Sequence, residues 1–137
     1  MATAADKKKA PARRRGAADA SPADAPVVRA KARYVRVAPR KARLVADQVR
    51  GMPVSEARTL LQFSPRDAAR DVARLLDSAA ANAEANHDLV ADDLRIAEIY
   101  VDEGPTLKRW RARARGRAAR IDKKTSHLSV ALIPTTD

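Results

Sequence analysis

The sequence predicts an α+β fold, and three observations lead to it. Residues 27–37, 94–101 and 127–133 are short β-strand candidates in which apolar and polar side chains tend to alternate. The stretch 39–84 instead carries helix-start signals and apolar residues spaced three or four apart. Between the last two strand candidates, the basic segment 105–124 has arginine at every second position from residue 109 to residue 117. Together these strand and helix patterns make up the predicted α+β fold.

Composition limits the function. A chain of 137 residues is long enough for one domain, and only 26 of its residues are Leu, Ile, Val or Phe. It has no cysteine, which excludes disulfides, thiol catalysis and Cys-ligated zinc. No apolar run approaches the roughly 20 residues of a membrane span. The net charge of +11 and the pI near 10.8 favour a polyanionic partner.

The charge is segregated along the chain. Residues 1–43 contain 13 basic and 3 acidic residues, residues 44–104 contain 6 and 12, and residues 105–124 contain 9 and 1. Residues 1–26 have no large apolar side chain after Met1, so we expect a disordered basic N-terminal arm. Three aspartates in this arm argue against a transit peptide. Residues 27–137 are then expected to form a single domain.

The first strand candidate and the helix after it carry cations. Residues 27–37 alternate as a strand does, and Pro39 is placed to begin a helix that ends at Arg50, before Gly51. The predicted apolar stripe of this helix is Leu44, Val45 and Val49. Another face of the same helix carries Arg40, Arg43, Asp47 and Arg50. Such a face can be an ordinary solvated surface, but in so basic a chain we favour contact with RNA.

Two more helices are predicted in the acidic middle. A short one follows Pro53, and its inward side chains are Val54, Ala57, Leu60 and Leu61. A longer one begins at Ser64-Pro65, with Ser64 as N-cap, and reaches about Glu84. Its inward side chains are Val72, Leu75, Leu76, Ala79 and Ala83. Ion pairs are expected along it between Asp67 and Arg70 and between Asp71 and Arg74.

The two later strands are defined by alternation. In residues 94–101 we expect Leu94, Ile96 and Tyr100 on one side. In residues 127–133 we expect Leu128, Val130 and Leu132 on one side. These three strands and three helices make up the predicted body.

The arm between those strands is the most informative segment. Its five arginines at a spacing of two are Arg109, Arg111, Arg113, Arg115 and Arg117. Period two is strand geometry, so we expect an extended hairpin that turns near residues 113–117, with guanidinium groups on one face and a positive φ at Gly116. A disordered basic linker is the alternative. Crowded like charges destabilise a bare ribbon, whereas phosphates stabilise it, and Trp110 is then expected to stack on a base or a guanidinium.

Enzymatic chemistry is disfavoured. His87 and His127 are the only histidines and lie in separate segments, without metal-ligand spacing. His127 is interpreted either as a phosphate contact or as a half-buried structural residue. Asp102 and Glu103 face opposite ways on a strand, so they are expected to pair with the basic arm rather than to act as an acid/base pair. We expect no cofactor, no metal and no small-molecule substrate. A free architectural nucleic-acid binder remains the alternative function.

Several motifs resemble one family over about residues 30–133. The segments VDEGPTLKR (residues 101–109), RARGRA (residues 113–118) and KTSH (residues 124–127) are similar to bacterial large-subunit ribosomal protein twenty-two. APRKARLVADQVRG (residues 38–51) and SAAANAEANH (residues 78–87) are similar to it as well. Two positions depart from the family pattern, namely Ala112, where many relatives have proline, and Ala38, where serine is frequent and would cap the first helix.

The resemblance implies three helices packed on a small antiparallel sheet, with a long β-hairpin protruding over about residues 102–127. It implies a ribosomal protein of the cytoplasmic large subunit that binds 23S-class rRNA, contacts neighbouring ribosomal proteins, supports assembly, and lines the polypeptide exit tunnel beside the nascent chain. The residues expected to bind rRNA are Arg33, Arg36, Arg40, Lys41, Arg43, Arg50, Lys108, Arg109, Trp110, Arg111, Arg113, Arg115, Arg117, Arg120, Lys123, Lys124 and His127. The residues expected at the tunnel tip are Leu107, Lys108, Arg109, Trp110, Arg111, Ala112, Arg113, Ala114, Arg115 and Gly116.

Overall fold

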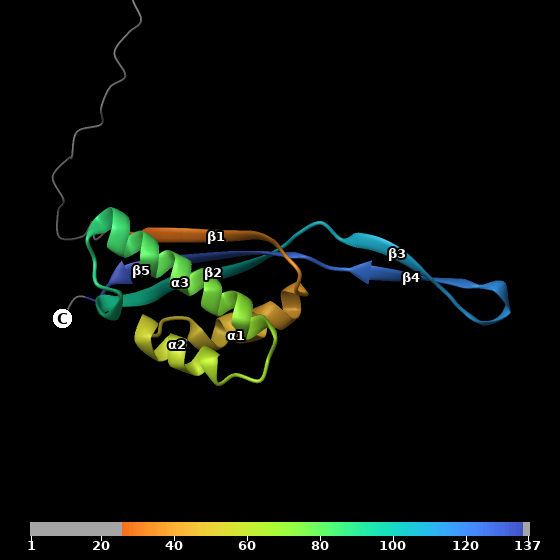
Figure 1. The fold of residues 1–137 in the computed structure, drawn as a ribbon, viewed down its shortest axis with the longest axis horizontal. Helices are drawn as coiled ribbons and strands as arrows, with labels where there is room; N and C mark the ends of the chain where they lie inside the picture. The colour runs from red at the N-terminus through yellow and green to blue at the C-terminus, as the bar shows by residue number, and fades with distance from the viewer. Residues whose placement is uncertain (1–25, 136–137) are drawn as a thin grey trace, which may run out of the picture.

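The computed structural model describes residues 26–135 and has the α+β fold that the sequence predicts (Figure 1). In chain order the elements are β1 (Val28–Val35), α1 (Pro39–Val49), α2 (Val54–Gln62), α3 (Ala68–His87), β2 (Leu94–Glu103), β3 (Leu107–Ala112), β4 (Ala118–Lys123) and β5 (Ser126–Pro134). Short 3₁₀ turns occur at Ala91–Asp93 and Ala114–Gly116. The arm predicted for residues 1–26 lies, apart from Pro26, outside the described residues.

The strands of the body form one antiparallel sheet in the order β1-β5-β2, so the last strand of the chain lies in the middle. Leu128, Val130 and Leu132 of β5 are buried, as the alternation predicts. α3 packs against β1 and β5, α1 packs against β2, and α2 packs against α3. In Figure 1, α1 and α2 lie below the strands and α3 crosses in front of them. The three helices therefore cover the face of the sheet to which β5 turns its large apolar side chains.

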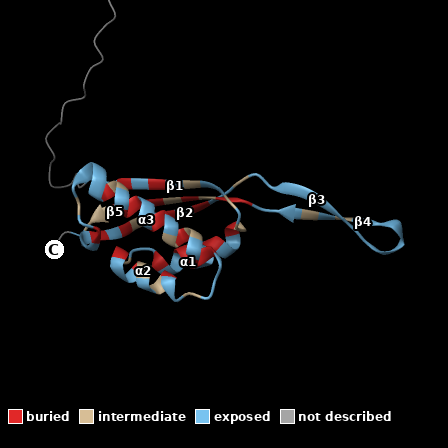
Figure 2. Cartoon of the chain, in the orientation of Figure 1, coloured by how far each residue is buried: buried red, intermediate tan, exposed pale blue. Residues whose placement is uncertain are grey.

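Alanine makes the core of α3 dense. Val72, Leu75 and Leu76 are buried as predicted. The alanines buried beside them are Ala68, Ala69, Ala79, Ala80 and Ala83. In Figure 2, red bands that mark buried residues recur along α3. Because a methyl group occupies little space, the helix approaches the sheet closely, and a chain with few large apolar residues still forms a packed core.

The apolar stripe predicted for the first helix is partly wrong. Val45 and Val49 are fully buried, but Leu44 is 50% exposed. Ala42 and Ala46 complete the buried stripe instead. Each residue turns an α-helix by about 100°, so Leu44 points well away from its neighbour Val45 and toward solvent.

The predicted start of the third helix is also wrong. α3 begins at Ala68 rather than at Ser64-Pro65, and Ser64 accepts only a long hydrogen bond, 3.5 Å, from the backbone N–H of Arg66. The helix continues to His87, past the predicted end at Glu84. Ser64 and Pro65 therefore lie in the connection before α3 and not in the first turn of the helix.

The ion pairs predicted along α3, Asp67–Arg70 and Asp71–Arg74, do not form. Among residues 26–135 the ion pairs are Arg50–Asp47, Arg58–Asp77 and Arg120–Asp122. Arg58 Nε lies 2.9 Å from Asp77 Oδ1 and connects α2 to α3. Asp77 of α3 thus forms an ion pair with another helix rather than with a residue of its own helix.

A β-bulge changes the side that β2 presents. Leu94 and Ile96 are buried as predicted, but the register shifts between Ile96 and Glu98. After the shift Ile99 and Val101 face the core. Tyr100, predicted to lie on the side of Leu94 and Ile96, is 54% exposed. One extra residue in the strand reverses the faces of all that follow it.

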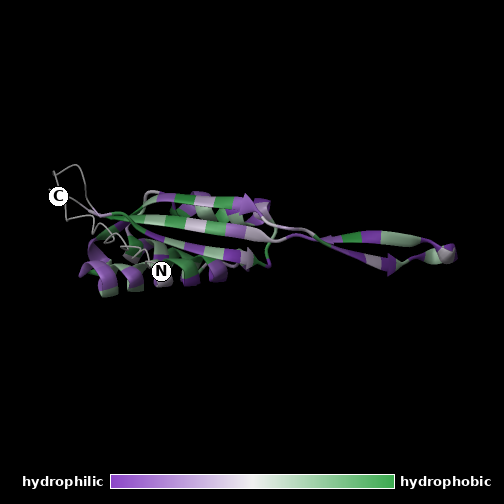
Figure 3. Ribbon diagram, turned by 90° about the horizontal axis from the view of Figure 1, so that it is seen from above, coloured by the Kyte–Doolittle hydropathy of each residue, from purple (hydrophilic) through white to green (hydrophobic). Residues whose placement is uncertain are grey.

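The hairpin of β3 and β4 is a separate two-stranded sheet. It protrudes from one end of the body in Figure 1, and in Figure 3 it continues along the long axis of the three-stranded sheet. The polypeptide enters it after β2 and returns from it into β5. β2 and β5, which are neighbours in the sheet, therefore carry the hairpin outward.

Candidate nucleic-acid interface

The hairpin has the turn that the sequence predicts. β3 and β4 are paired in register from Leu107↔Lys123 to Ala112↔Ala118. Across the loop, the backbone N–H of Arg113 donates to the carbonyl of Arg117 at 2.7 Å. Gly116 has φ +69°, as expected, and Arg115 beside it also has a positive φ of 59°. Two adjacent left-handed residues thus reverse the chain.

The five arginines do not all share one face. Arg109 and Arg111 do share a face, and their cross-strand partners on that face are Ile121 and Ala119. The other three belong to the loop, where the period of two ends because the chain turns. The opposite face of the hairpin carries Lys108, Trp110, Arg120 and Asp122. Cations therefore surround the outer part of the hairpin instead of lining one side, which corrects the prediction.

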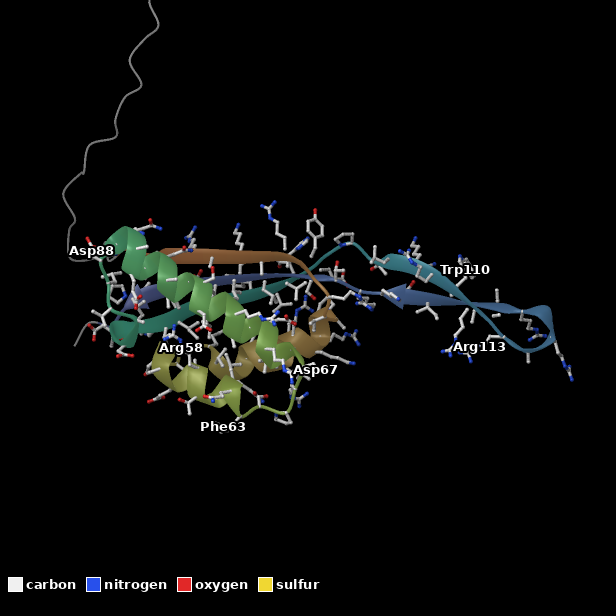
Figure 4. All side chains as sticks on the ribbon, in the orientation of Figure 1. Arg58, Phe63, Asp67, Asp88, Trp110 and Arg113 are labelled. Atoms are coloured by element: carbon white, nitrogen blue, oxygen red, sulfur yellow. The ribbon has the colours of Figure 1, made fainter. Side chains whose placement is uncertain are left out.

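Trp110 stands free of the body. Its side chain is 70% exposed and lies opposite Arg120 in the register. Arg120 donates from Nε to Asp122 Oδ1 at 2.9 Å, on the same strand. Figure 4 shows the labelled Trp110 and Arg113 on the hairpin, well beyond the helices. An exposed indole among guanidinium groups can stack on a base.

The root of the hairpin is held by a small set of close contacts. The backbone N–H of Gly104 donates to the carbonyl of Thr125 at 2.9 Å, and Thr125 Oγ1 donates to the carbonyl of Pro105 at 2.6 Å. Ser126 is fully buried and donates from Oγ to the carbonyl of Val37. Gly104 and Pro105 lie in the connection between β2 and β3, and the bend predicted there stays a prediction. The two hydroxyl residues that hold it have no distinguishing pattern in the sequence.

Four of the predicted cations gather around this root: Arg36, Arg40, Lys41 and Lys124. Arg36 donates to the carbonyl of Lys124 and so connects the end of β1 to the end of the hairpin. A groove of about 680 Å³ lies there, bordered by Lys41, Lys124 and also by Arg66. Arg66 was not among the predicted site residues, because it precedes a helix in an acidic segment and carries no local signal.

Arg43 and Arg50 contact the body. Arg43 donates from Nε and Nη2 to the carbonyl of Val101, at 3.2 and 3.1 Å. Arg50 donates to the carbonyl of Ile99 at 3.0 Å and to Asp47 at 2.8 Å. Both side chains therefore fasten α1 to β2. Their contact with RNA stays a prediction.

His127 and Arg33 lie at the bulge of β1. The Nδ1 atom of His127 accepts a hydrogen bond from the backbone N–H of Tyr34 at 3.1 Å, and the two rings meet edge to face at 5.1 Å. His127 is partly buried and Arg33 is exposed. The structural interpretation of His127 is thus supported, and a phosphate contact through its other nitrogen stays a prediction.

The carboxylates next to the hairpin do not pair as predicted. Within the described range, Asp102 and Glu103 take part in none of the three ion pairs.

Residues 26–135 contain no group of three His, Cys, Asp or Glu side chains that could hold a metal ion. No helix in residues 26–135 is both long and apolar enough to cross a membrane.

Comparison with known proteins identifies one family that matches most of the chain. The model of the family described as ribosomal protein L22p/L17e matches residues 30–133. The large ribosomal subunit protein uL22 of Desulfitobacterium hafniense is 54% identical over 105 residues, which cover 77% of this chain and 92% of that protein. The matched region includes the hairpin, its root and the three-stranded sheet.

Proposed function

Because the chain belongs to the ribosomal protein L22p/L17e family, we propose that it is a structural constituent of the large ribosomal subunit in the cytoplasm and binds 23S-class rRNA. Its interface is the hairpin together with the cations at the hairpin root. The family consists of structural ribosomal proteins and not of enzymes. Neighbouring ribosomal proteins are its further partners.

The observation that carries this proposal is the exposure of the hairpin. Every residue of β3 is exposed, and β3 and β4 pair only with each other. An isolated two-stranded ribbon is marginally stable in water, and closely spaced guanidinium groups destabilise it further. Phosphates remove that repulsion, and the release of their counterions favours binding. We therefore expect the hairpin to be stable when it is embedded in folded RNA.

The tip of the hairpin, residues 107–116, is proposed to line the exit tunnel beside the nascent chain. Six-residue strands extend about 20 Å at roughly 3.3 Å per residue, so the loop reaches far beyond the body. The body then stays outside while the tip reaches the interior of the RNA. Support for subunit assembly follows, because one protein would connect RNA segments that lie far apart.

Salt-dependent binding tests the RNA contact. In the full chain, Arg109, Arg111 and Arg113 are replaced by glutamine, and binding to a 23S-class rRNA transcript is measured over a range of salt. The slope of log K against log salt should fall by about 2 to 3, since each phosphate contact contributes about 0.7–0.9. The matched control replaces Arg58, Arg70 and Arg74 of α2 and α3, which lie away from the hairpin; Arg70 and Arg74 are exposed and Arg58 is half-buried. Equal slopes in the two variants would contradict the proposal.

Two further experiments separate the details. Co-sedimentation with large subunits after a high-salt wash distinguishes a ribosomal component from a free nucleic-acid binder, which would be washed off. The chain has no cysteine, so Ala114→Cys creates a unique thiol at the tip. On translating ribosomes, a photo-cross-linker attached to this thiol should react with a nascent chain, whereas the same reagent attached at Ser78→Cys on α3 should not. A tip that never cross-links would refute the tunnel position.

A further inference from the structure

The face of the three-stranded sheet opposite the helices carries an organised set of polar and aromatic side chains. It holds a shallow groove of about 300 Å³. The outward side chains along the groove are Arg29 and Lys31 of β1, Ser129 and Ala131 of β5, and Glu98, Tyr100 and Asp102 of β2. Among the described residues, none of these charged side chains belongs to an ion pair.

The strand register arranges these side chains in rows across the sheet. One row is Arg29, Ala131 and Glu98, and the next is Lys31, Ser129 and Tyr100. Neighbouring strands lie about 4.8 Å apart, so cations of β1 and side chains of β2 stand roughly 10 Å apart. Between them the floor is formed by small side chains. The groove is thus positive along one edge and negative along the other.

Aromatic rings stand at the same face. A bulge in β1 places two residues opposite His127, and one of them, Tyr34, has a positive φ of 57°. Its ring is 66% exposed and is held edge to face against His127. Tyr100 is 54% exposed two strands away. The left-handed conformation is strained for a tyrosine, and in this bulge it places the aromatic ring of Tyr34 in solvent.

We propose that this face is a second RNA-binding surface, which holds a single-stranded segment of rRNA. The phosphates lie along Arg29, Lys31 and Arg33, the bases stack on Tyr34 and Tyr100, and base amino groups donate to the carboxylates of β2. The inference rests on the proposed function but uses none of the hairpin. The sequence predicts Arg33 and His127 as separate rRNA contacts. In the fold they border the same surface as Lys31 and Tyr34.

The charge pattern favours this occupant over others. A duplex would bring phosphates over both edges of the groove and be repelled by Glu98 and Asp102. A packed helix of another protein would require large apolar side chains, and the floor offers only Ala131 and Ser129. A single strand has its phosphates on one side and its base edges on the other, which matches a groove with one cationic and one anionic edge.

The sequence provides separate reporters for the two surfaces. Tyr34 and Tyr100 are the only tyrosines and both lie on this face, while Trp110 is the only tryptophan and lies on the hairpin. The full-length, nucleic-acid-free protein is labelled with fluorotyrosine and titrated with a short oligocytidine RNA. Tyrosine resonances then report binding at the sheet, and tryptophan fluorescence reports binding at the hairpin.

We expect both tyrosine resonances to shift on titration. Replacing Arg29 and Lys31 by glutamine should weaken the binding read at the tyrosines at least fivefold, whereas the same change at Arg70 and Arg74 should not. Tyr100→Ala should weaken the binding read at the other tyrosine about tenfold. Tyr100→Phe, which keeps the ring, should bind like the original protein.

The outcomes distinguish the two proposals. If Trp110 responds to RNA and the tyrosine resonances stay unmoved, the sheet surface is refuted and the proposed function stands. If neither reporter responds, to the oligonucleotide or to a 23S-class transcript, the proposed function fails and the sheet surface fails with it. Equal affinity for oligocytidine and oligouridine at the tyrosines would refute the role given to the carboxylates, because uracil has no amino group.

Discussion

Gly104→Ala tests how the hairpin is fastened to the body. A Cβ atom at this position would lie 2.5 Å from Thr125 Oγ1 and 3.2 Å from the carbonyl carbon and oxygen of Thr125. The hydroxyl cannot rotate away without losing its hydrogen bond to the carbonyl of Pro105. The backbone cannot withdraw without lengthening the 2.9 Å bond from the Gly104 N–H. Either response loosens the point where the hairpin leaves the sheet.

The expected loss of unfolding free energy is about 2–3 kcal/mol. Forcing a methyl group into a filled space costs about 1–3 kcal/mol, and losing the Thr125–Pro105 hydrogen bond costs about 1 kcal/mol. For a domain of this size the melting temperature should fall by roughly 10 °C. Thermal unfolding followed by circular dichroism at 222 nm, which reports chiefly on the three helices, measures the change.

A double-mutant cycle isolates the contact. Thr125→Ala removes the atom at 2.5 Å, so Gly104→Ala combined with Thr125→Ala should be less destabilised than the sum of the single changes. Gly51→Ala is the control, because a Cβ there meets nothing within 4 Å and its cost of about 1 kcal/mol comes from φ +80° alone. If Gly104→Ala melts like the original protein, or if the two changes are simply additive, the close approach described here is wrong.

Four further predictions follow from the fold. Arg43→Ala should lower the free energy of unfolding by about 1–2 kcal/mol in chemical denaturation, because two hydrogen bonds to β2 are lost, whereas Arg40→Ala should leave it within 0.5 kcal/mol. Leu76→Ala should cost about 2–5 kcal/mol, since the side chain is fully buried, and an unchanged midpoint would contradict its place in the core. In the protein without RNA, the amides of residues 108–119 should exchange much faster than those of α3, and strong protection would refute a hairpin that needs RNA. Deleting residues 2–26 should leave the cooperative melting transition intact.

The sequence predicts well whatever depends on local periodicity. The buried side of β5 and the inward residues of α3 follow directly from spacings of two and of three to four. The hairpin and its turn follow from the arginine spacing and from Gly116. These features depend on neighbouring residues alone, so a single sequence is sufficient to find them.

Features that depend on distant segments were missed. Tyr100 was placed on the wrong side because a bulge is a mismatch between two strands, and only one of them is read at a time. The hydrogen bonds of Arg43 and Arg50 to β2 were not predicted, since nothing in α1 indicates that the carbonyls of β2 lie within reach, and the RNA contact of both residues stays a prediction. Leu44 is predicted to be buried because it is a large apolar residue, whereas Ala42 and Ala46 are the residues that pack there.

The outer edge of β2 is closed by the protein's own groups. Backbone groups of residues 51–52 exchange hydrogen bonds with Ile96, and the guanidinium groups of Arg50 and Arg43 cover carbonyls farther along the strand. A strand from a second molecule would need those same oxygens to extend the sheet. α1 and residues 51–52 thus occupy the edge of the sheet at which a fourth strand could otherwise pair. The covered edge therefore leaves a second molecule few free backbone groups of β2 with which to pair.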